Sequence, residues 1–118
     1  MATARFILGF DESADRLAEG LKEARQAVDL APRDALAHAT LALALAADDH
    51  LTPALEEARR AADLDPGNAE GHVAVGIVLR LRRDFDASLA ACRRAGDLAP
   101  EDPRVLVALA DTLRELER

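Results

Sequence analysis

The chain has 118 residues, enough for one domain, with a formal net charge of −7 and a single cysteine. The negative charge argues against a nucleic-acid partner, because binding to phosphates is driven by Lys and Arg, and one cysteine excludes an internal disulfide and slightly favours a reducing compartment. No apolar run approaches the roughly 18 residues of a membrane span, and the N-terminus lacks a secretory-signal pattern, so we expect a soluble, cytoplasmic protein with no membrane partner.

Residues 1–10 are the least regular part of the chain. Apolar side chains crowd together there around Gly9, and the helical period fits poorly. The crowded residues are Phe6, Ile7, Leu8 and Phe10. We expect a short or distorted helix over this segment.

The helical period becomes clear from about residue 11 to residue 30. Asp11 or Ser13 is suited to cap the N-terminus of this helix, and Pro32 ends it, since a residue before proline leaves the α region. Its apolar face is predicted to carry Leu17, Leu21, Ala24, Ala27 and Val28.

Five further helical segments follow, and none of the chain shows the alternation of a strand. Asp34, Asn68 and Asp102 each precede a segment as a capping residue, and Thr52 is predicted to cap another, with a proline at its first helical position. The segments span about 35–48, 53–64, 69–82, 86–98 and 103–117. The sequence therefore predicts an all-α domain.

The helices repeat with a period of 34 residues, which separates Pro32, Pro66 and Pro100. A fixed period of this length is the signature of stacked repeats. Aligned at that period, small residues form columns where helices can approach closely. These columns are Ala42, Gly76 and Ala110; Gly20, Ala54 and Ser88; and Ala27, Ala61 and Ala95. Large apolar columns lie beside them: Leu41, Val75 and Leu109; Leu45, Leu79 and Leu113; and Leu21, Leu55 and Leu89.

The repeat length, the order of small and large residues and the closing proline resemble the tetratricopeptide-repeat family over residues 11–118. The matching residues are Leu41, Ala42, Leu45, Ala54, Ala58, Ala61, Pro66, Val75, Gly76, Leu79, Phe85, Ala95 and Pro100. The resemblance implies a right-handed superhelical solenoid of antiparallel helix pairs, with about three repeats and a C-terminal capping helix. The expected units are a degenerate first repeat over 1–34, full repeats over 35–68 and 69–102, and the capping helix over 103–118.

The family's frequent aromatic residues are missing from this chain. His38 and His72 stand where tryptophan is common, and Leu45 and Leu79 where tyrosine is common. The alanine-rich style is similar to repeats in large bacterial regulators, such as those appended to adenylate cyclases. One hypothesis for the chain is therefore that it is a regulatory fragment of a larger bacterial protein.

The last helix is predicted to cap the stack, with an apolar inner face and a polar outer face. The inner face would hold Val105, Leu106, Leu109, Ala110 and Leu113. The outer face would hold Asp111, Thr112, Arg114, Glu115, Glu117 and Arg118.

In the family, the first helix of each pair lines a concave groove, and helical spacing selects the residues that would point into it. They are Leu36, Ala39, Thr40, Leu43, Ala47, Glu70, Val73, Ala74, Ile77, Arg80, Arg104, Val107, Ala108, Asp111 and Arg114. Some members bind acidic chaperone tails through a clamp of Lys, Arg and Asn in this groove. The corresponding places here hold Ala39, Leu43, Val73 and Ile77, so we expect no such activity.

Three interpretations of this apolar surface stay open. It is a groove for an apolar or amphipathic helix of a protein partner, or a surface covered by residues 6–10 or by a second copy in a homodimer, or ordinary exposed surface. The helix over 35–48 favours some cover, since His38 and Thr40 are its only polar residues before Asp48, and a helix that is apolar all round is normally buried.

No residue pattern indicates catalysis, a metal or a cofactor. The chain lacks a glycine-rich phosphate loop and the common hydrolase motifs. The histidines are expected to fill space in place of aromatic residues, and Cys92 to be a buried, inert thiol. Arg25, Arg59 and Arg93 recur at the repeat period, each four residues before an aspartate, which predicts i, i+4 ion pairs on a solvated face rather than a phosphate-binding ridge.

Overall fold

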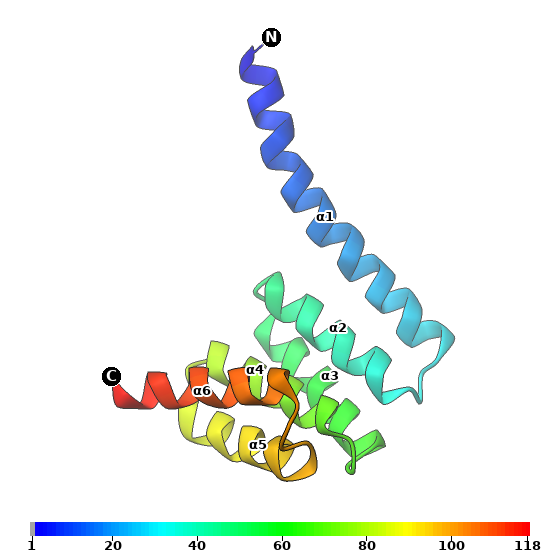
Figure 1. Cartoon of the computed structure of the whole chain (residues 1–118). Helices are drawn as coiled ribbons and strands as arrows, with labels where there is room; N and C mark the ends of the chain where they lie inside the picture. The colour runs from blue at the N-terminus through cyan, green and yellow to red at the C-terminus, as the bar shows by residue number, and fades with distance from the viewer. Residues whose placement is uncertain (1) are drawn as a thin grey trace.

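The computed structural model in Figure 1 describes the backbone of residues 2–118 and the side chains from residue 14 onward. Over these residues the chain forms helices and no strand, which confirms the all-α prediction. The helices are α1 (Ala2–Leu30), α2 (Ala35–Ala47), α3 (Leu51–Leu64), α4 (Ala69–Leu81), α5 (Phe85–Leu98) and α6 (Pro103–Glu117).

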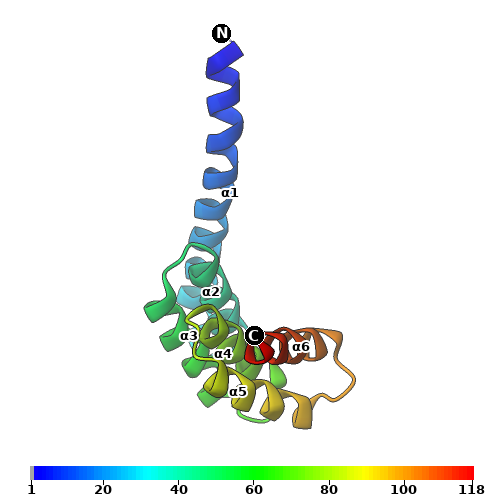
Figure 2. The same ribbon diagram turned by 90° about the vertical axis from the view of Figure 1, so that its left-hand side faces the viewer.

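The helices stack in chain order as a solenoid of helix pairs. Helices α2 and α3 form one antiparallel pair and α4 and α5 the next, while α6 packs on both members of the second pair (Figures 1 and 2). The first helices lie side by side, because α4 contacts α2 on one side and α6 on the other. Among the described helices, α1 contacts only α2.

Helix α1 is longer than the sequence predicts. The expected break near residue 10 is wrong, because one helix runs without interruption from Ala2 to Leu30. A single interior glycine costs only about 1 kcal/mol in a helix, which is too little to end one. The N-terminal half runs away from the other helices in Figures 1 and 2, so residues 6–10 do not fold back to cover the groove. Six side chains discussed above lie outside the described ones: Phe6, Ile7, Leu8, Phe10, Asp11 and Ser13.

Three of the five predicted N-caps are confirmed, whereas the cap expected at Asp11 or Ser13 is wrong, because the backbone of α1 is helical through both positions. The carboxylate or amide oxygens of Asp34, Asn68 and Asp102 accept hydrogen bonds from backbone N–H groups two residues on, at 3.0, 3.0 and 2.9 Å. The prediction for Thr52 is wrong. Helix α3 begins at Leu51 with His50 in the capping position, so Thr52 lies in the first turn.

The turns inside the helix pairs explain this early start. Asp49 and Arg83, one period apart, have φ angles of 63° and 68°, the left-handed conformation that glycine usually supplies after a helix. The N–H groups of His50 and Asp84 then bond to the carbonyls of Leu45 and Leu79 at 2.8 and 2.9 Å. The chain thus reverses within three residues, and the next helix begins at once.

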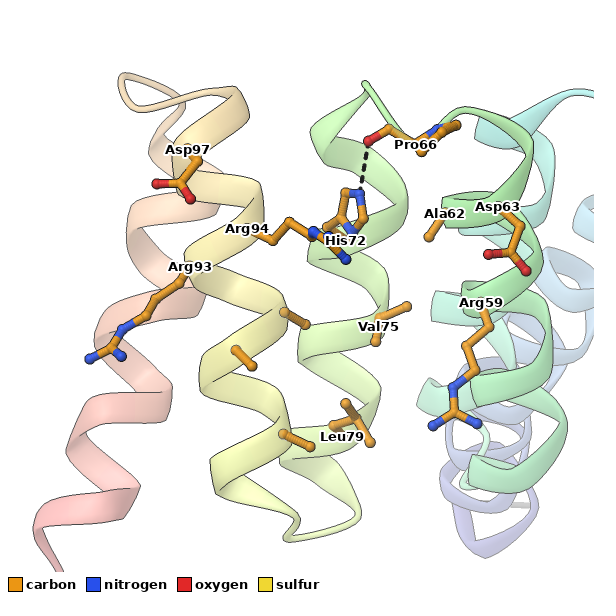
Figure 3. Close-up of a pocket in the computed structure, with 13 residues that line it drawn as sticks. Arg59, Ala62, Asp63, Pro66, His72, Val75, Leu79, Arg93, Arg94 and Asp97 are labelled. Atoms are coloured by element: carbon orange, nitrogen blue, oxygen red, sulfur yellow. Dashed lines mark hydrogen bonds between the residues drawn. The ribbon is translucent and has the colours of Figure 1, made fainter.

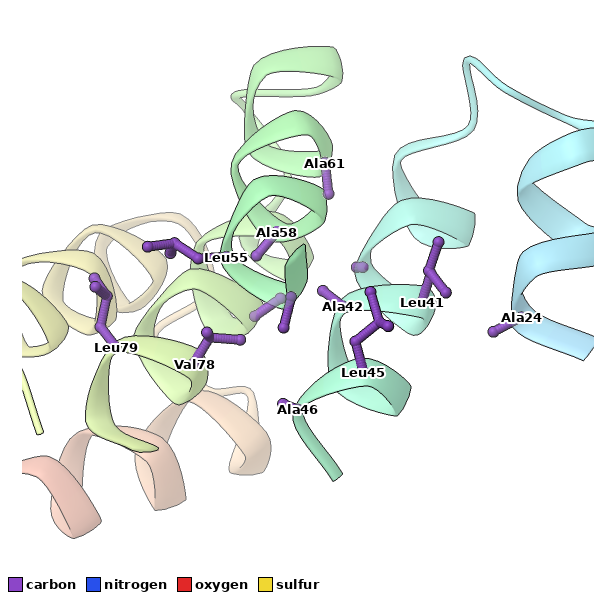
Figure 4. Close-up of a cluster of buried hydrophobic side chains, with 13 residues drawn as sticks. Ala24, Leu41, Ala42, Leu45, Ala46, Leu55, Ala58, Ala61, Val78 and Leu79 are labelled. Atoms are coloured by element: carbon purple, nitrogen blue, oxygen red, sulfur yellow. The ribbon is translucent and has the colours of Figure 1, made fainter. Parts of the chain in front are cut away.

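Small residues bring the helices of the core together (Figure 4). Ala42, Ala54, Ala58 and Ala61 have exposed fractions of 0%. At Gly71, which the columns above do not include, an added Cβ would lie 2.5 Å from the backbone nitrogen of Ala62. Helix α4 therefore crosses α3 at a distance that only glycine permits at this point.

The end members of the same columns are not covered. Gly20 and Ala27 of α1 and Ala110 of α6 are exposed, although their equivalents in α2–α5 are buried. Helix α1 has the residue pattern of the second helix of a repeat, and α6 has that of the first helix of a repeat. Within the described chain, each lacks the partner against which this face would pack.

Helix α6 accordingly presents a different face from the one predicted. Val105 is buried as expected, but Leu106 and Leu113 are 50% and 39% exposed, and Thr112 is fully buried. The Thr112 hydroxyl donates to the carbonyl of Ala108 at 2.9 Å and lies 3.0 Å from Ser88 Oγ. Ser88 in turn donates to the carbonyl of Gly76 at 2.7 Å. Buried hydroxyls are satisfied here, and the leucines stay outside because no described helix follows α6.

Candidate functional site

The first helices of the stack enclose a cavity of about 410 Å³, which we call the groove. Three helices contribute to it, α2 at one edge, α4 along the middle and the start of α6 at the other edge. Its lining residues are Leu43, Glu70, Val73, Ile77, Arg80, Pro103, Arg104, Val107, Ala108 and Asp111.

Nine of these ten residues are among those that helical spacing selects. Pro103 is the addition, since the sequence assigns it only a role in starting α6. Ala39 does not belong to the groove: it is 2% exposed, and its side chain packs into the main core, as does that of Ala74. Leu36, Thr40 and Ala47 are exposed on α2 outside the lining. Arg114 is likewise exposed on α6 and outside it.

The charged residues at the rim are mostly paired with one another. The Arg104 guanidinium forms an ion pair with Glu70 and another, at 3.1 Å, with Asp102. Hydrogen bonds from the side chain and the backbone of Arg104 lower the pKa of Asp102, and those from Arg104 to Asp102 and Glu70 raise the pKa of Arg104. Asp111 is 3.4 Å from Arg114. Arg80 differs, because its Nε is buried without a hydrogen-bond partner among the described residues.

A second, more open cavity of about 770 Å³ lies between α3, α4 and α5 and shares no lining residue with the groove (Figure 3). Arg59, Arg93, Asp63 and Asp97 contribute to its wall. Within the described residues no ion pair joins Arg59 to Asp63, Arg93 to Asp97 or, on α1, Arg25 to Asp29, so the predicted i, i+4 pairs are wrong. Figure 3 shows Arg59 and Arg93 extending away from the aspartates.

Cys92, His38 and His72 are buried, in line with the sequence analysis, whereas His50 lies exposed in the turn before α3. Cys92 is 1% exposed, His38 2% and His72 8%. Both imidazoles bond through Nε2 to the carbonyl of the proline that closes the preceding repeat, His38 to Pro32 at 2.6 Å and His72 to Pro66 at 3.0 Å. In the described part of the chain, no three His, Cys, Asp or Glu side chains are arranged to hold a metal ion. Nor is any described helix both long and apolar enough to cross a membrane.

Comparisons with known proteins give matches only among solved structures. No protein-family model and no curated protein matches the sequence. The TPR domain of Sgt2 from Aspergillus fumigatus superposes with a TM-score of 0.78 at 18% identity, covering 92% of this chain and 74% of that one. The TPR2B domain of yeast Sti1 in its pHsp70 complex has a TM-score of 0.73 at 14% identity, covering 97% and 96%.

A third match is the first TPR of Spaghetti (RPAP3) bound to the HSP90 peptide SRMEEVD. It has a TM-score of 0.75 at 13% identity and covers 90% of this chain and 84% of that one. The matched proteins share the stacked helix pairs with this chain but little sequence. The chain therefore has the tetratricopeptide-repeat fold.

Proposed function

We propose that the chain is a non-catalytic protein-interaction module that binds an apolar or amphipathic helix in the groove. The observation that carries this proposal is the apolar floor shared by three helices. Leu43 of α2 is 38% exposed, Val107 of α6 is 59% exposed, and Val73 and Ile77 of α4 line the cavity between them. Apolar anchors spaced i, i+3, i+4 and i+7 on a partner helix match such a floor.

The rim adds a polar requirement on the partner. Glu70 and Arg104 neutralise each other, as do Asp111 and Arg114. Arg80 is left with a buried Nε that lacks a partner among the described residues. Unpaired buried donors are costly, so a partner that places a carboxylate or carbonyl oxygen opposite Arg80 gains affinity.

Two of the structurally similar domains are complexes with chaperone segments, one of them the acidic peptide SRMEEVD. The groove of this chain is chemically different. Leu43, Val73 and Ile77 supply apolar surface at places where clamp-bearing family members carry Lys, Arg or Asn, and Arg104 is already paired. We therefore propose selectivity for apolar anchors over acidic tails.

The test uses two fluorescent peptides. One is an amphipathic helical peptide with leucines at i, i+3, i+4 and i+7 and one glutamate, and the other is SRMEEVD. Fluorescence anisotropy is expected to show saturable binding of the first and none of the second. The Leu43→Asp, Ile77→Asp double variant is expected to lose the first interaction while keeping its helical circular dichroism.

A matched control is Leu64→Asp, because Leu64 is 40% exposed but lines none of the described cavities. This variant is expected to bind the amphipathic peptide as the parent does. The proposal fails if the groove variant binds normally, or if SRMEEVD binds more tightly than the amphipathic peptide.

Self-association is a second candidate, supported by the two unpaired ends of the stack. Ala110 and Leu113 on α6 belong to the columns that contact a second helix in α2–α5, and Gly20 and Ala27 on α1 belong to the columns that contact a first helix. The exposed face of α6 on one copy can therefore pack against the exposed face of α1 on another copy, as α2 packs against α3 within the chain. A contact of α6 on one copy with α1 on another is heterologous, so it builds open chains or rings rather than a closed dimer.

Light scattering after size exclusion tests this candidate over a range of concentrations. Head-to-tail association predicts a mass that keeps rising with concentration, and Ala110→Glu is expected to return the chain to a monomer. A strict monomer at the highest attainable concentration counts against self-association and leaves the groove proposal intact.

A further inference from the structure

The repeat over 35–68 contains an internal charged triad. His38 is buried at 2% exposure, its Nε2 lies 2.6 Å from the carbonyl of Pro32, and its Nδ1 lies 2.6 Å from Glu57 Oε2. The other carboxylate oxygen of Glu57 faces Arg60 Nη1 at 3.7 Å. A carbonyl oxygen only accepts, so Nε2 carries a proton, and Glu57 bridges the remaining ring nitrogen and an arginine.

The next repeat keeps every part of this triad except the carboxylate. His72, Pro66 and Arg94 lie 34 residues after His38, Pro32 and Arg60, respectively. The residue equivalent to Glu57, however, is Ala91. His72 retains the bond from Nε2 to the carbonyl of Pro66 at 3.0 Å. Its Nδ1 has no hydrogen-bond partner among the described residues, although His72 is only 8% exposed.

The position of the missing carboxylate opens into the cavity of about 770 Å³ between α3, α4 and α5. His72, Ala91 and Arg94 all line it. In Figure 3, Arg94 extends from α5 toward α4, where His72 projects from the wall. Asp63 and Asp97 also line the cavity, but in the figure neither carboxylate reaches the histidine, and no hydrogen bond joins either one to it.

We infer that this cavity is a binding site for a carboxylate supplied from outside the chain, held between His72 Nδ1 and the Arg94 guanidinium. Glu57 shows within the same molecule what the arrangement accepts, because the preceding repeat fills the equivalent place with a carboxylate from its own second helix. Because Nε2 already donates to the Pro66 carbonyl, His72 contacts the carboxylate as an imidazolium, with a second proton on Nδ1. Charge-assisted hydrogen bonds from an arginine and an imidazolium to an ionised acceptor are strong. The carboxylate belongs either to a free carboxylic acid or to an acidic side chain of a polypeptide.

The site is tested by titrating the whole chain with sodium acetate, with citrate and with the blocked peptide Ac-Ala-Glu-Ala-NH2. Nitrogen resonances of the His72 ring and of Arg94 Nε are followed by NMR at constant ionic strength. Saturable shifts of both residues with any carboxylate support the site. Tighter binding of citrate than of the peptide assigns a free acid as the source, and the reverse order assigns a polypeptide.

Two reciprocal variants sharpen the test. Ala91→Glu supplies the carboxylate in cis, so acetate affinity is expected to fall at least about tenfold, the loss that follows from one competing charged contact. Leu98→Glu adds the same charge to an exposed position on α5 outside the cavity and is expected to leave binding unchanged. Glu57→Ala opens the equivalent place in the preceding repeat, so His38 and Arg60 are expected to respond to acetate in that variant only.

The inference is overturned if chloride at equal ionic strength reproduces the shifts, or if inorganic phosphate saturates the site while no carboxylate does. It is also overturned if Ala91→Glu binds acetate as the parent does. Should Ala91→Glu fail to fold, the response of His38 and Arg60 in Glu57→Ala decides the question. None of these outcomes depends on what the groove binds.

Discussion

At the scale of single residues, Gly71 limits how the two halves of the stack meet. Its α-carbon lies so close to α3 that an added Cβ would sit 2.5 Å from the nitrogen and 2.6 Å from the α-carbon of Ala62. Both are backbone atoms, which cannot move aside as the end of a side chain can. The packing of α4 on α3, and with it the position of Val73 and Ile77 in the groove, therefore depends on the absence of a side chain.

Gly71→Ala is accordingly expected to lower the free energy of unfolding by about 1–3 kcal/mol, the usual cost of overpacking. Gly20→Ala is the matched control, since nothing lies within 4 Å of a Cβ built there. It is expected to raise stability by about 0.5–1 kcal/mol, because alanine is the better helix former. Urea denaturation measures both, and a neutral or stabilising Gly71→Ala would contradict the packing argument.

Most residues of the groove are accessible to prediction from helical spacing. Once the residues that face the neighbouring helix are assigned, the spacing leaves Ile77 and Val107 pointing to the concave side, and both line the cavity. Ala39 is placed wrongly because it lies between two faces of α2, and the contact of α2 with α4 covers it. The spacing of one helix does not encode how closely its neighbour approaches.

At the scale of elements, the two turns with a left-handed residue carry backbone strain. A residue other than glycine in this conformation costs roughly 1–2 kcal/mol, and the chain places Asp49 and Arg83 there. Arg83 recovers part of the cost, because its guanidinium lies 5.7 Å from the centre of the Phe85 ring. Asp49 has no such contact among those described.

Asp49→Gly is therefore expected to raise the free energy of unfolding by up to about 1 kcal/mol. Arg83→Gly is expected to gain less, since it also removes the contact with Phe85. The comparison of the two thermal unfolding midpoints measures the difference. A larger gain for Arg83→Gly than for Asp49→Gly would contradict this order.

The elements themselves are predictable from the sequence where a cap and a repeat period agree. The starts of α2, α4 and α6 follow from their capping Asp or Asn, and these positions are confirmed. The rotation of α6 is not predictable in the same way. Its apolar pattern is that of a helix packed on two sides, whereas the described chain covers one side, and the buried hydroxyls of Ser88 and Thr112 then set which side it is.

At the scale of the whole molecule, the stack is close to one-dimensional, since contacts join neighbouring helices and successive first helices only. In such a chain the stability of each helix depends on how many neighbours it has. Helices α3 and α4 are held on both sides, whereas α1 contacts α2 alone. Local opening is therefore expected to begin at the N-terminal end.

Amide hydrogen exchange measures this gradient. Protection is expected to be greatest in α3 and α4, lower in α6 and lowest in α1. Uniform protection along the chain would contradict the stack as a series of local contacts and would indicate a single cooperative unit. Protection of α1 that rises with protein concentration would instead support the head-to-tail association of copies.

The contact between the buried hydroxyls of Ser88 and Thr112, whose oxygens lie 3.0 Å apart, has a consequence for the shape of the groove. Thr112 is adjacent to Asp111 in α6, and Asp111, Val107 and Arg104 together form one wall of the groove. The roll of α6 on α5 thus sets the width of the opening, and two hydroxyls buried away from the opening fix that roll. On the proposed function, a change at either hydroxyl is expected to alter which partner helix fits, although neither hydroxyl lines the groove.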